Sequence, residues 1–212
     1  MQMSLKAAYR RLLSETGYSF VVAPTGDIVD WEDYPGLVGV GQAQAEVCLH
    51  VVPGSFNPLH VAHKEIRDHI SWPSVMTFYE ISIVRVDKEM VSFDELQERL
   101  GQFKNYAPVV VTRAARFVEK IGTLLQHAKL LVFHVGIDTV TRMRDDYGTI
   151  GIQGLAATFV VHDRVVNGTL RSLSTSFVGD TPFNCVPSPA VRSAETLAMS
   201  SSKIRKEGIG HV

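Results

Sequence analysis

From about residue 46 onward, short apolar runs alternate with segments that have helical spacing. Continuous apolar runs such as 130–133 predict strands that are covered on both faces, as in a parallel sheet. The expected strands are 46–52, 78–84, 109–112, 130–135 and 158–162, with a short sixth at 184–186. The expected helices are 59–70, 93–103, 114–127, 138–144 and 201–206. This alternation predicts a doubly wound α/β fold with its ligand at the carboxyl ends of the strands.

The first 45 residues have a different pattern. Residues 5–16 have helical spacing, and the apolar runs 18–22 and 28–31 flank the turn sequence Pro-Thr-Gly-Asp at 24–27, which predicts a hairpin. A glycine-rich connector follows at 35–45. We therefore expect an N-terminal helix-hairpin extension over 1–45 and a main domain over 46–212.

Composition and charge narrow the function classes. The 212 residues are 45% hydrophobic and 20% charged, and 21 Lys and Arg against 22 Asp and Glu give a net charge of −1. This balance creates no overall field for nucleic acid or an anionic membrane, and no apolar run is long enough for a membrane span. The two cysteines, Cys48 and Cys185, lie in apolar contexts. We expect two free thiols, a cytoplasmic location, and no nucleic-acid or membrane partner.

The segment Gly-Ser-Phe-Asn-Pro-Leu-His-Val-Ala-His at 54–63 follows the first strand of the main domain and precedes a helix. Free N–H groups and the positive end of a helix dipole suit this position to phosphate binding, and Gly54 allows the backbone to approach closely. Asn57 is the expected N-cap and Pro58 the expected first helical residue. His60 and His63 then share one helix face and can donate hydrogen bonds to phosphate oxygens.

A metal is the alternative ligand for this histidine pair. Catalytic zinc takes about three protein ligands and structural zinc takes four. His69 falls on a different helix face, and the chain has no Cys-x-x-Cys motif. We therefore predict no protein metal site.

Two further segments have the residue types of a nucleotide site. In Ser-Ser-Ser-Lys-Ile-Arg at 200–205, hydroxyls at a helix start and a guanidinium one turn later could clamp phosphates, or could form only a polar helix cap. Gly136 and Asp138 follow the strand at 130–135. The glycine permits close approach of a ligand, and the aspartate can cap the helix or bind a ribose hydroxyl.

The motifs at 54–63 and 200–205 together resemble those of the nucleotidyltransferase superfamily, whose patterns are HxGH and SSTxIR. They stand about 140 residues apart, as in a compact domain of that family. The resemblance implies a Rossmann-like parallel sheet of the nucleotidylyltransferase type. It implies catalytic roles for His60, His63 and Arg205. The nucleotide-binding residues that it implies are Gly54, Ser55, Phe56, Gly136, Asp138, Ser201 and Ser202.

The segments 79–88, 111–120 and 136–139 resemble one branch of this superfamily, the nicotinamide-mononucleotide adenylyltransferase-like proteins. The branch implies transfer of AMP from ATP to nicotinamide mononucleotide, giving NAD and pyrophosphate. The acceptor-binding residues that it implies are Lys88, Thr112, Arg113 and Phe117, with Tyr147 as a weaker candidate. The chain departs from the pattern at Ala62, where the motif has glycine, and at Arg85, where the branch often has asparagine.

An acceptor phosphate is already ionised at neutral pH, so this reaction needs no strong general base. Mg²⁺ would be carried by the ATP phosphates, because it retains its waters and needs few protein ligands. Two alternatives stay open: another acceptor (nicotinate mononucleotide, phosphopantetheine or a phosphorylated alcohol) and a non-catalytic nucleotide sensor. The sequence does not fix the oligomeric state, and a homo-oligomer is compatible with it.

Overall fold

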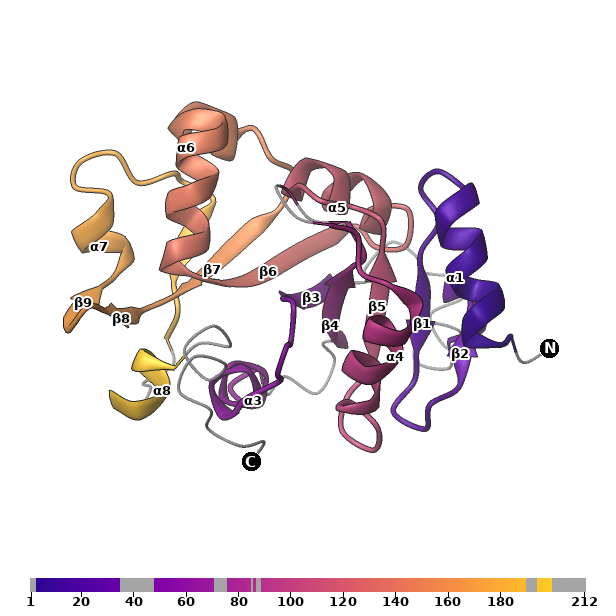
Figure 1. Ribbon diagram of the computed structural model, residues 1–212. Helices are drawn as coiled ribbons and strands as arrows, with labels where there is room; N and C mark the ends of the chain where they lie inside the picture. The colour runs from indigo at the N-terminus through magenta and orange to yellow at the C-terminus, as the bar shows by residue number, and fades with distance from the viewer. Residues whose placement is uncertain are drawn as a thin grey trace.

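A computed structural model describes residues 3–34, 48–70, 76–84, 86, 89–189 and 194–199. Its main feature is one eight-stranded sheet with the order β10-β7-β6-β3-β4-β5-β1-β2 (Figure 1). The fold is therefore the doubly wound α/β arrangement that the alternation predicted. The predicted helix at 201–206 and the connector at 35–45 lie outside the described residues.

Six strands form the parallel part of the sheet. They are β3 (Cys48–Pro53), β4 (Met76–Ser82), β5 (Val109–Thr112), β6 (Leu130–Gly136), β7 (Thr158–His162) and β10 (Cys185–Pro187). Strand β3 pairs with β4 on one side and with β6 on the other, so the strand order reverses between β3 and β6. This switch point is where an open α/β sheet leaves a crevice at its carboxyl edge.

The N-terminal segment forms the predicted helix and hairpin. Helix α1 (Leu5–Ser14) is capped by the Ser4 side chain, which accepts a hydrogen bond from the Ala7 N–H. Strands β1 (Phe20–Val22) and β2 (Ile28–Val29) are antiparallel, and β1 also pairs antiparallel with β5. The extension therefore adds two strands to the central sheet. The domain division at residues 45 and 46 stays a prediction, because the connecting residues are not described.

Helices cover both faces of the sheet (Figure 1). Helices α5 (Phe117–Leu124), α6 (Ile137–Gln153) and α7 (Leu173–Ser176) pack on one face, over a core that includes Phe133 and Phe159. Helices α1, α3 (Val61–Asp68) and α4 (Phe93–Gly101) pack on the other, over a core that includes Tyr79 and Ile81. A short helix α8 (Ala194–Ala198) contacts α3 and strand β8 (Arg164–Val166).

Two local predictions need correction, and one hairpin was missed. Helix α3 begins at Val61 with His60 as its N-cap, so Asn57 is not the N-cap and Pro58 lies in a turn before the helix. Helix α6 continues to Gln153 and is kinked at Gly148, so it extends well beyond the predicted end at residue 144. The hairpin of β8 (Arg164–Val166) and β9 (Thr169–Arg171) was not predicted.

None of the helices in the described part of the chain has both the length and the apolar character that crossing a membrane requires. The longest of them, α6, has 17 residues and buries Ile137, Val140, Met143 and Ile152.

Candidate active site

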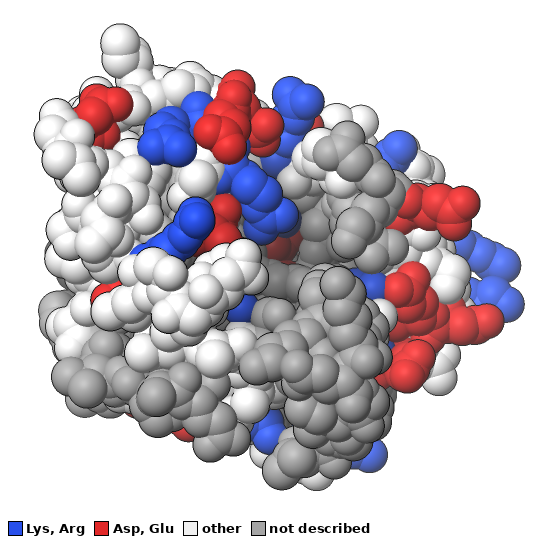
Figure 2. Space-filling model, turned by 60° about the vertical axis from the view of Figure 1, so that its left-hand side comes forward, with Lys and Arg blue, Asp and Glu red and all other residues white. Residues whose placement is uncertain are grey.

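A cavity of about 760 Å³ lies at the carboxyl edge of the sheet, around the ends of β3, β4 and β6. The loop after β3, the start of α3, the start of α5 and the first half of α6 complete its wall. Figure 2 shows basic and acidic side chains close together around a hollow in this side of the molecule. The cavity thus occupies the switch-point position that the alternation of strands and helices predicted.

The loop after β3 requires a glycine at its first position. A Cβ on Gly54 would lie 2.7 Å from Cζ of Phe56, because the Phe56 ring folds back beneath the loop. That ring is fully buried and makes edge contacts with His63, Tyr79 and Phe103. Gly54 and Ser55 line the cavity, whereas the Phe56 side chain belongs to the core.

The two motif histidines form a stacked pair at the start of α3. His60 is the N-cap and His63 lies in the first turn, and their ring centroids are 3.7 Å apart. The backbone N–H of His60 donates to Nδ1 of His63 at 3.5 Å, which favours the His63 tautomer with its proton on Nε2. Both rings line the cavity at a helix N-terminus, where backbone N–H groups favour anions. The alanine between them, Ala62, is 3% exposed and is accommodated within the helix.

The turn from β6 to α6 forms a second part of the cavity wall. Gly136 is the N-cap of α6, and a Cβ there would lie 2.6 Å from Oδ1 of Asp138 and 3.1 Å from Cδ of Arg164. Nη1 of Arg164 donates to both carboxylate oxygens of Asp138 at 3.1 Å. Arg164 also donates to the carbonyl of Met199 at 2.6 Å. The β8–β9 hairpin therefore holds Asp138 in place and ties the end of α8 to the cavity.

A buried ion pair lies at the floor of the cavity near β4 and α5. Nζ of Lys120 lies 2.7 and 2.8 Å from the two carboxylate oxygens of Glu80, and the Thr112 hydroxyl donates to the same carboxylate at 2.6 Å. Glu80 and Lys120 both line the cavity, and their side chains are 1% and 9% exposed. This pair was not predicted from the sequence. Its two residues are 40 positions apart, and charged residues near strand ends usually face solvent.

Three histidines form a row across neighbouring strands. Nδ1 of His50 lies 2.9 Å from Nε2 of His134, and Nδ1 of His134 lies 3.3 Å from Nε2 of His162. Burial, followed by the proximity of His162 and His50, lowers the pKa of His134 to about 3. Burial also lowers the pKa of His50. At neutral pH His134, which lines the cavity, is therefore uncharged, and its two ring nitrogens lie within hydrogen-bond distance of His50 and His162.

The predicted acceptor-binding residues that the structure describes divide into two groups. Phe117 and Tyr147 line the cavity. Thr112 is fully buried beneath Glu80, and Arg113 donates to the carbonyl of Leu13 at 2.8 Å, so the geometry gives both of them structural contacts away from the cavity surface.

The remaining predicted residues, Lys88, Ser201, Ser202 and Arg205, lie outside the described residues, and their roles stay predictions. Among the residues that the structure describes, no three His, Cys, Asp or Glu side chains are grouped as metal ligands would be.

Comparisons with known proteins identify the fold. No family model matches the chain, and a search of curated proteins finds no match. Among solved structures, the chain resembles the Plasmodium falciparum nicotinic acid mononucleotide adenylyltransferase complexed with NaAD, at 16% identity and a TM-score of 0.52. The likeness covers 76% of this chain and 83% of that one. The same enzyme complexed with APC aligns over the same shares at 14% identity and a TM-score of 0.48. The chain thus has the fold of a nucleotidylyltransferase.

Proposed function

We propose that this protein is an adenylyltransferase that moves AMP from ATP to nicotinamide mononucleotide, producing NAD and pyrophosphate. The observation that carries the proposal is the stacked pair of His60 and His63 at the N-terminus of α3, inside the switch-point cavity. The fold shared with a mononucleotide adenylyltransferase is consistent with it. The choice of nicotinamide rather than nicotinate rests on the motif resemblance, since the structural relative acts on nicotinic acid mononucleotide.

The proposed chemistry is a displacement at the α-phosphorus of ATP. An oxygen of the acceptor's 5′-phosphate forms a bond to that phosphorus, and the bond to the β-phosphate bridging oxygen breaks, releasing pyrophosphate. The acceptor oxygen carries no proton at neutral pH, so the site needs donors and positioning more than a base. His60 and His63 supply ring N–H donors to the phosphate oxygens, and the α3 N-terminus adds its dipole.

The opposite wall suits the nucleoside part of ATP. The Asp138 side chain stays 41% exposed while Arg164 fixes its position, so its carboxylate can still accept hydrogen bonds from ribose hydroxyls. Met199 lines the cavity and directly precedes the segment 200–205 in sequence. Ser201, Ser202 and Arg205 would hold the leaving pyrophosphate, and Mg²⁺ would be held by the triphosphate oxygens.

A coupled assay of pyrophosphate release tests the proposal. Purified protein is supplied with ATP, Mg²⁺ and one acceptor at a time: nicotinamide mononucleotide, nicotinate mononucleotide, phosphopantetheine or phosphocholine. We expect pyrophosphate and NAD with nicotinamide mononucleotide. ATP binding without turnover of any acceptor would indicate a nucleotide sensor. Turnover of phosphopantetheine or phosphocholine alone would retain the adenylyl transfer and refute the acceptor.

A further inference from the structure

In the Glu80–Lys120 ion pair, one N–H donor of the Lys120 ammonium is not used by Glu80. An ammonium has three N–H donors, and two of those of Lys120 point to the Glu80 oxygens at 2.7 and 2.8 Å. The ammonium makes no further hydrogen bond to a residue in the described part of the chain. Since Lys120 lines the cavity while its side chain is only 9% exposed, its third donor is available to a bound ligand.

The pair is also held rigidly. Thr112 donates to Glu80 at 2.6 Å from the neighbouring strand, and its hydroxyl accepts from the Ala114 N–H at 3.3 Å. Carboxylate, ammonium and hydroxyl therefore come from β4, α5 and β5, so none of the three can turn away independently. A buried pair fixed in this way presents one donor and one acceptor at a constant spacing.

The pair carries one negative and one positive charge and is neutral overall, and this balance decides which ligand group it suits. A carboxylate ligand could accept from Lys120, but it would then face the Glu80 carboxylate at close range in a poorly solvated site, which is unfavourable. An uncharged primary amide has a carbonyl that can accept from Lys120 and an N–H that can donate to Glu80. The pair is therefore complementary to a carboxamide and selects against a carboxylate.

An aromatic side chain lines the same cavity as the pair. Phe117 precedes Lys120 by three residues on α5, so the two side chains share one helix face, and both line the cavity. A flat heterocycle placed against Phe117 would bring its substituent toward the ion pair. Resting on the adenylyl transfer proposed above, we infer that Glu80 and Lys120 bind the carboxamide of the mononucleotide acceptor and thereby select it over the carboxylate analogue.

The test is the ratio of kcat/KM for nicotinamide mononucleotide to kcat/KM for nicotinate mononucleotide. Wild-type protein should favour the amide by about tenfold or more, because a site built for one hydrogen-bonding group leaves its polar atoms unpaired with the other. Glu80→Gln removes the opposing carboxylate and offers an amide donor, so the ratio should fall by about tenfold or more. Glu32→Gln makes the same chemical change at an exposed position and should leave the ratio unchanged.

The outcomes distinguish a failure of the carboxamide inference from a failure of the proposed adenylyl transfer. Turnover of both mononucleotides with equal or reversed preference in the wild type overturns the inference and retains the transfer. An unchanged ratio in folded Glu80→Gln also overturns it. No turnover of either mononucleotide by the wild type overturns both. If Glu80→Gln does not fold, the wild-type ratio and the ratio in Thr112→Val, which should fall toward one as Glu80 loses its anchor, decide the matter.

Discussion

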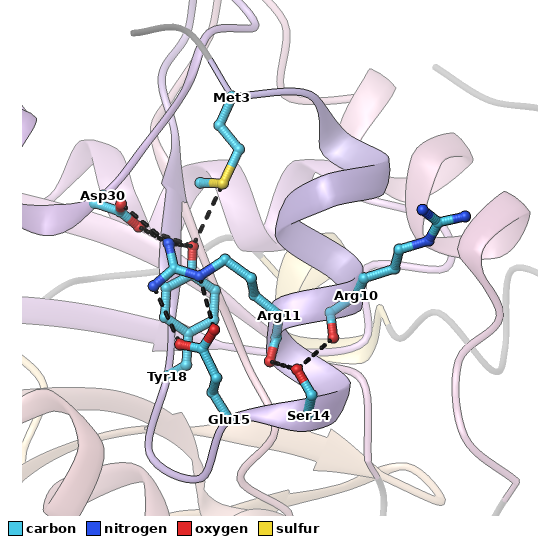
Figure 3. Close-up of polar contacts among 7 residues, drawn as sticks. All are labelled: Met3, Arg10, Arg11, Ser14, Glu15, Tyr18 and Asp30. Atoms are coloured by element: carbon cyan, nitrogen blue, oxygen red, sulfur yellow. Dashed lines mark hydrogen bonds and ion pairs between the residues drawn. The ribbon is translucent and has the colours of Figure 1, made fainter.

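Two groups of paired charged side chains in this molecule differ in how far they are exposed to solvent. On α1, Arg11 pairs with Glu15 at 3.0 Å and with Asp30 at 3.2 Å, and it lies over the ring of Tyr18 (Figure 3). The Arg11 side chain is 40% exposed there. In the cavity, Lys120 has one acidic partner and is 9% exposed.

The difference shows that burial matters more than the number of contacts. Water screens the Arg11 group and solvates its members when the contacts break, so such pairs contribute little to stability. Water cannot solvate the Glu80–Lys120 pair in this way, so loss of either partner leaves the other charge buried and poorly solvated. A costly buried pair that borders a cavity is a candidate for function, whereas an exposed network of the same composition is not.

The largest expected effect on stability is at Lys120. Lys120→Ala should lower the free energy of unfolding by about 3–5 kcal/mol, because it leaves Glu80 as an uncompensated buried charge. Urea unfolding followed by circular dichroism would measure it. The matched control removes both charges: Glu80→Leu combined with Lys120→Met should recover most of the loss. A double variant as unstable as the single one would show that the pair itself, and not an orphaned charge, determines stability.

A medium effect is expected from His134 in the histidine row, because burial disfavours the charged form of its ring. The pKa of His134 falls from an ordinary 6.5 to about 3 on folding, so the unfolded chain binds the proton more strongly between these values. The contribution of uncharged His134 to the free energy of unfolding is therefore fully present above pH 6.5, and it is lost as the pH falls toward 3. The lost stability should reach about 2 kcal/mol at pH 5.

This acid dependence can be measured as the difference between wild type and His134→Gln in unfolding free energy at pH 7 and pH 5. The variant should lose less stability on acidification than the wild type. His69→Gln, at an exposed position at the end of α3, serves as the control and should behave as the wild type does. Equal losses in wild type and His134→Gln would mean that the row does not resist protonation.

The smallest effect is expected at the exposed group. Arg11→Ala should change the urea midpoint only slightly at moderate ionic strength, and the difference from wild type should shrink further at high salt. A change as large as that of Lys120→Ala would remove the contrast between the two groups.

The sequence predicted the parallel strands well, because continuous apolar runs such as that of β6 have few other interpretations. It also placed the histidine segment and Gly136 after strands that prove to be neighbours, which brings His60, His63 and Asp138 to one cavity. The predicted start of α3 was wrong because Pro58 suits a turn as well as a first helical position, and the helix begins three residues later, at Val61.

Other features were missed for different reasons. The β8–β9 hairpin had a signal: Asn167 and Gly168 both adopt positive φ, and an Asn-Gly pair between short apolar runs is typical of a two-residue turn. The Glu80–Lys120 pair had none, since only the pairing of β4 with β5 and the packing of α5 bring these residues together. Thr112 and Arg113 were expected at the acceptor because they end a strand at the correct edge, but their side chains turn toward the core and toward α1.

The central claim is that His60 and His63 stabilise the charge that develops during adenylyl transfer. The most direct measurement is kcat for pyrophosphate release by His60→Ala and His63→Ala, at saturating ATP and nicotinamide mononucleotide, with His69→Ala on the same helix as the control. Loss of one such donor should lower kcat by about 10²–10³ while circular dichroism and the unfolding midpoint show a folded protein. His69→Ala should turn over as the wild type does. Wild-type kcat in either folded cavity variant would contradict the account.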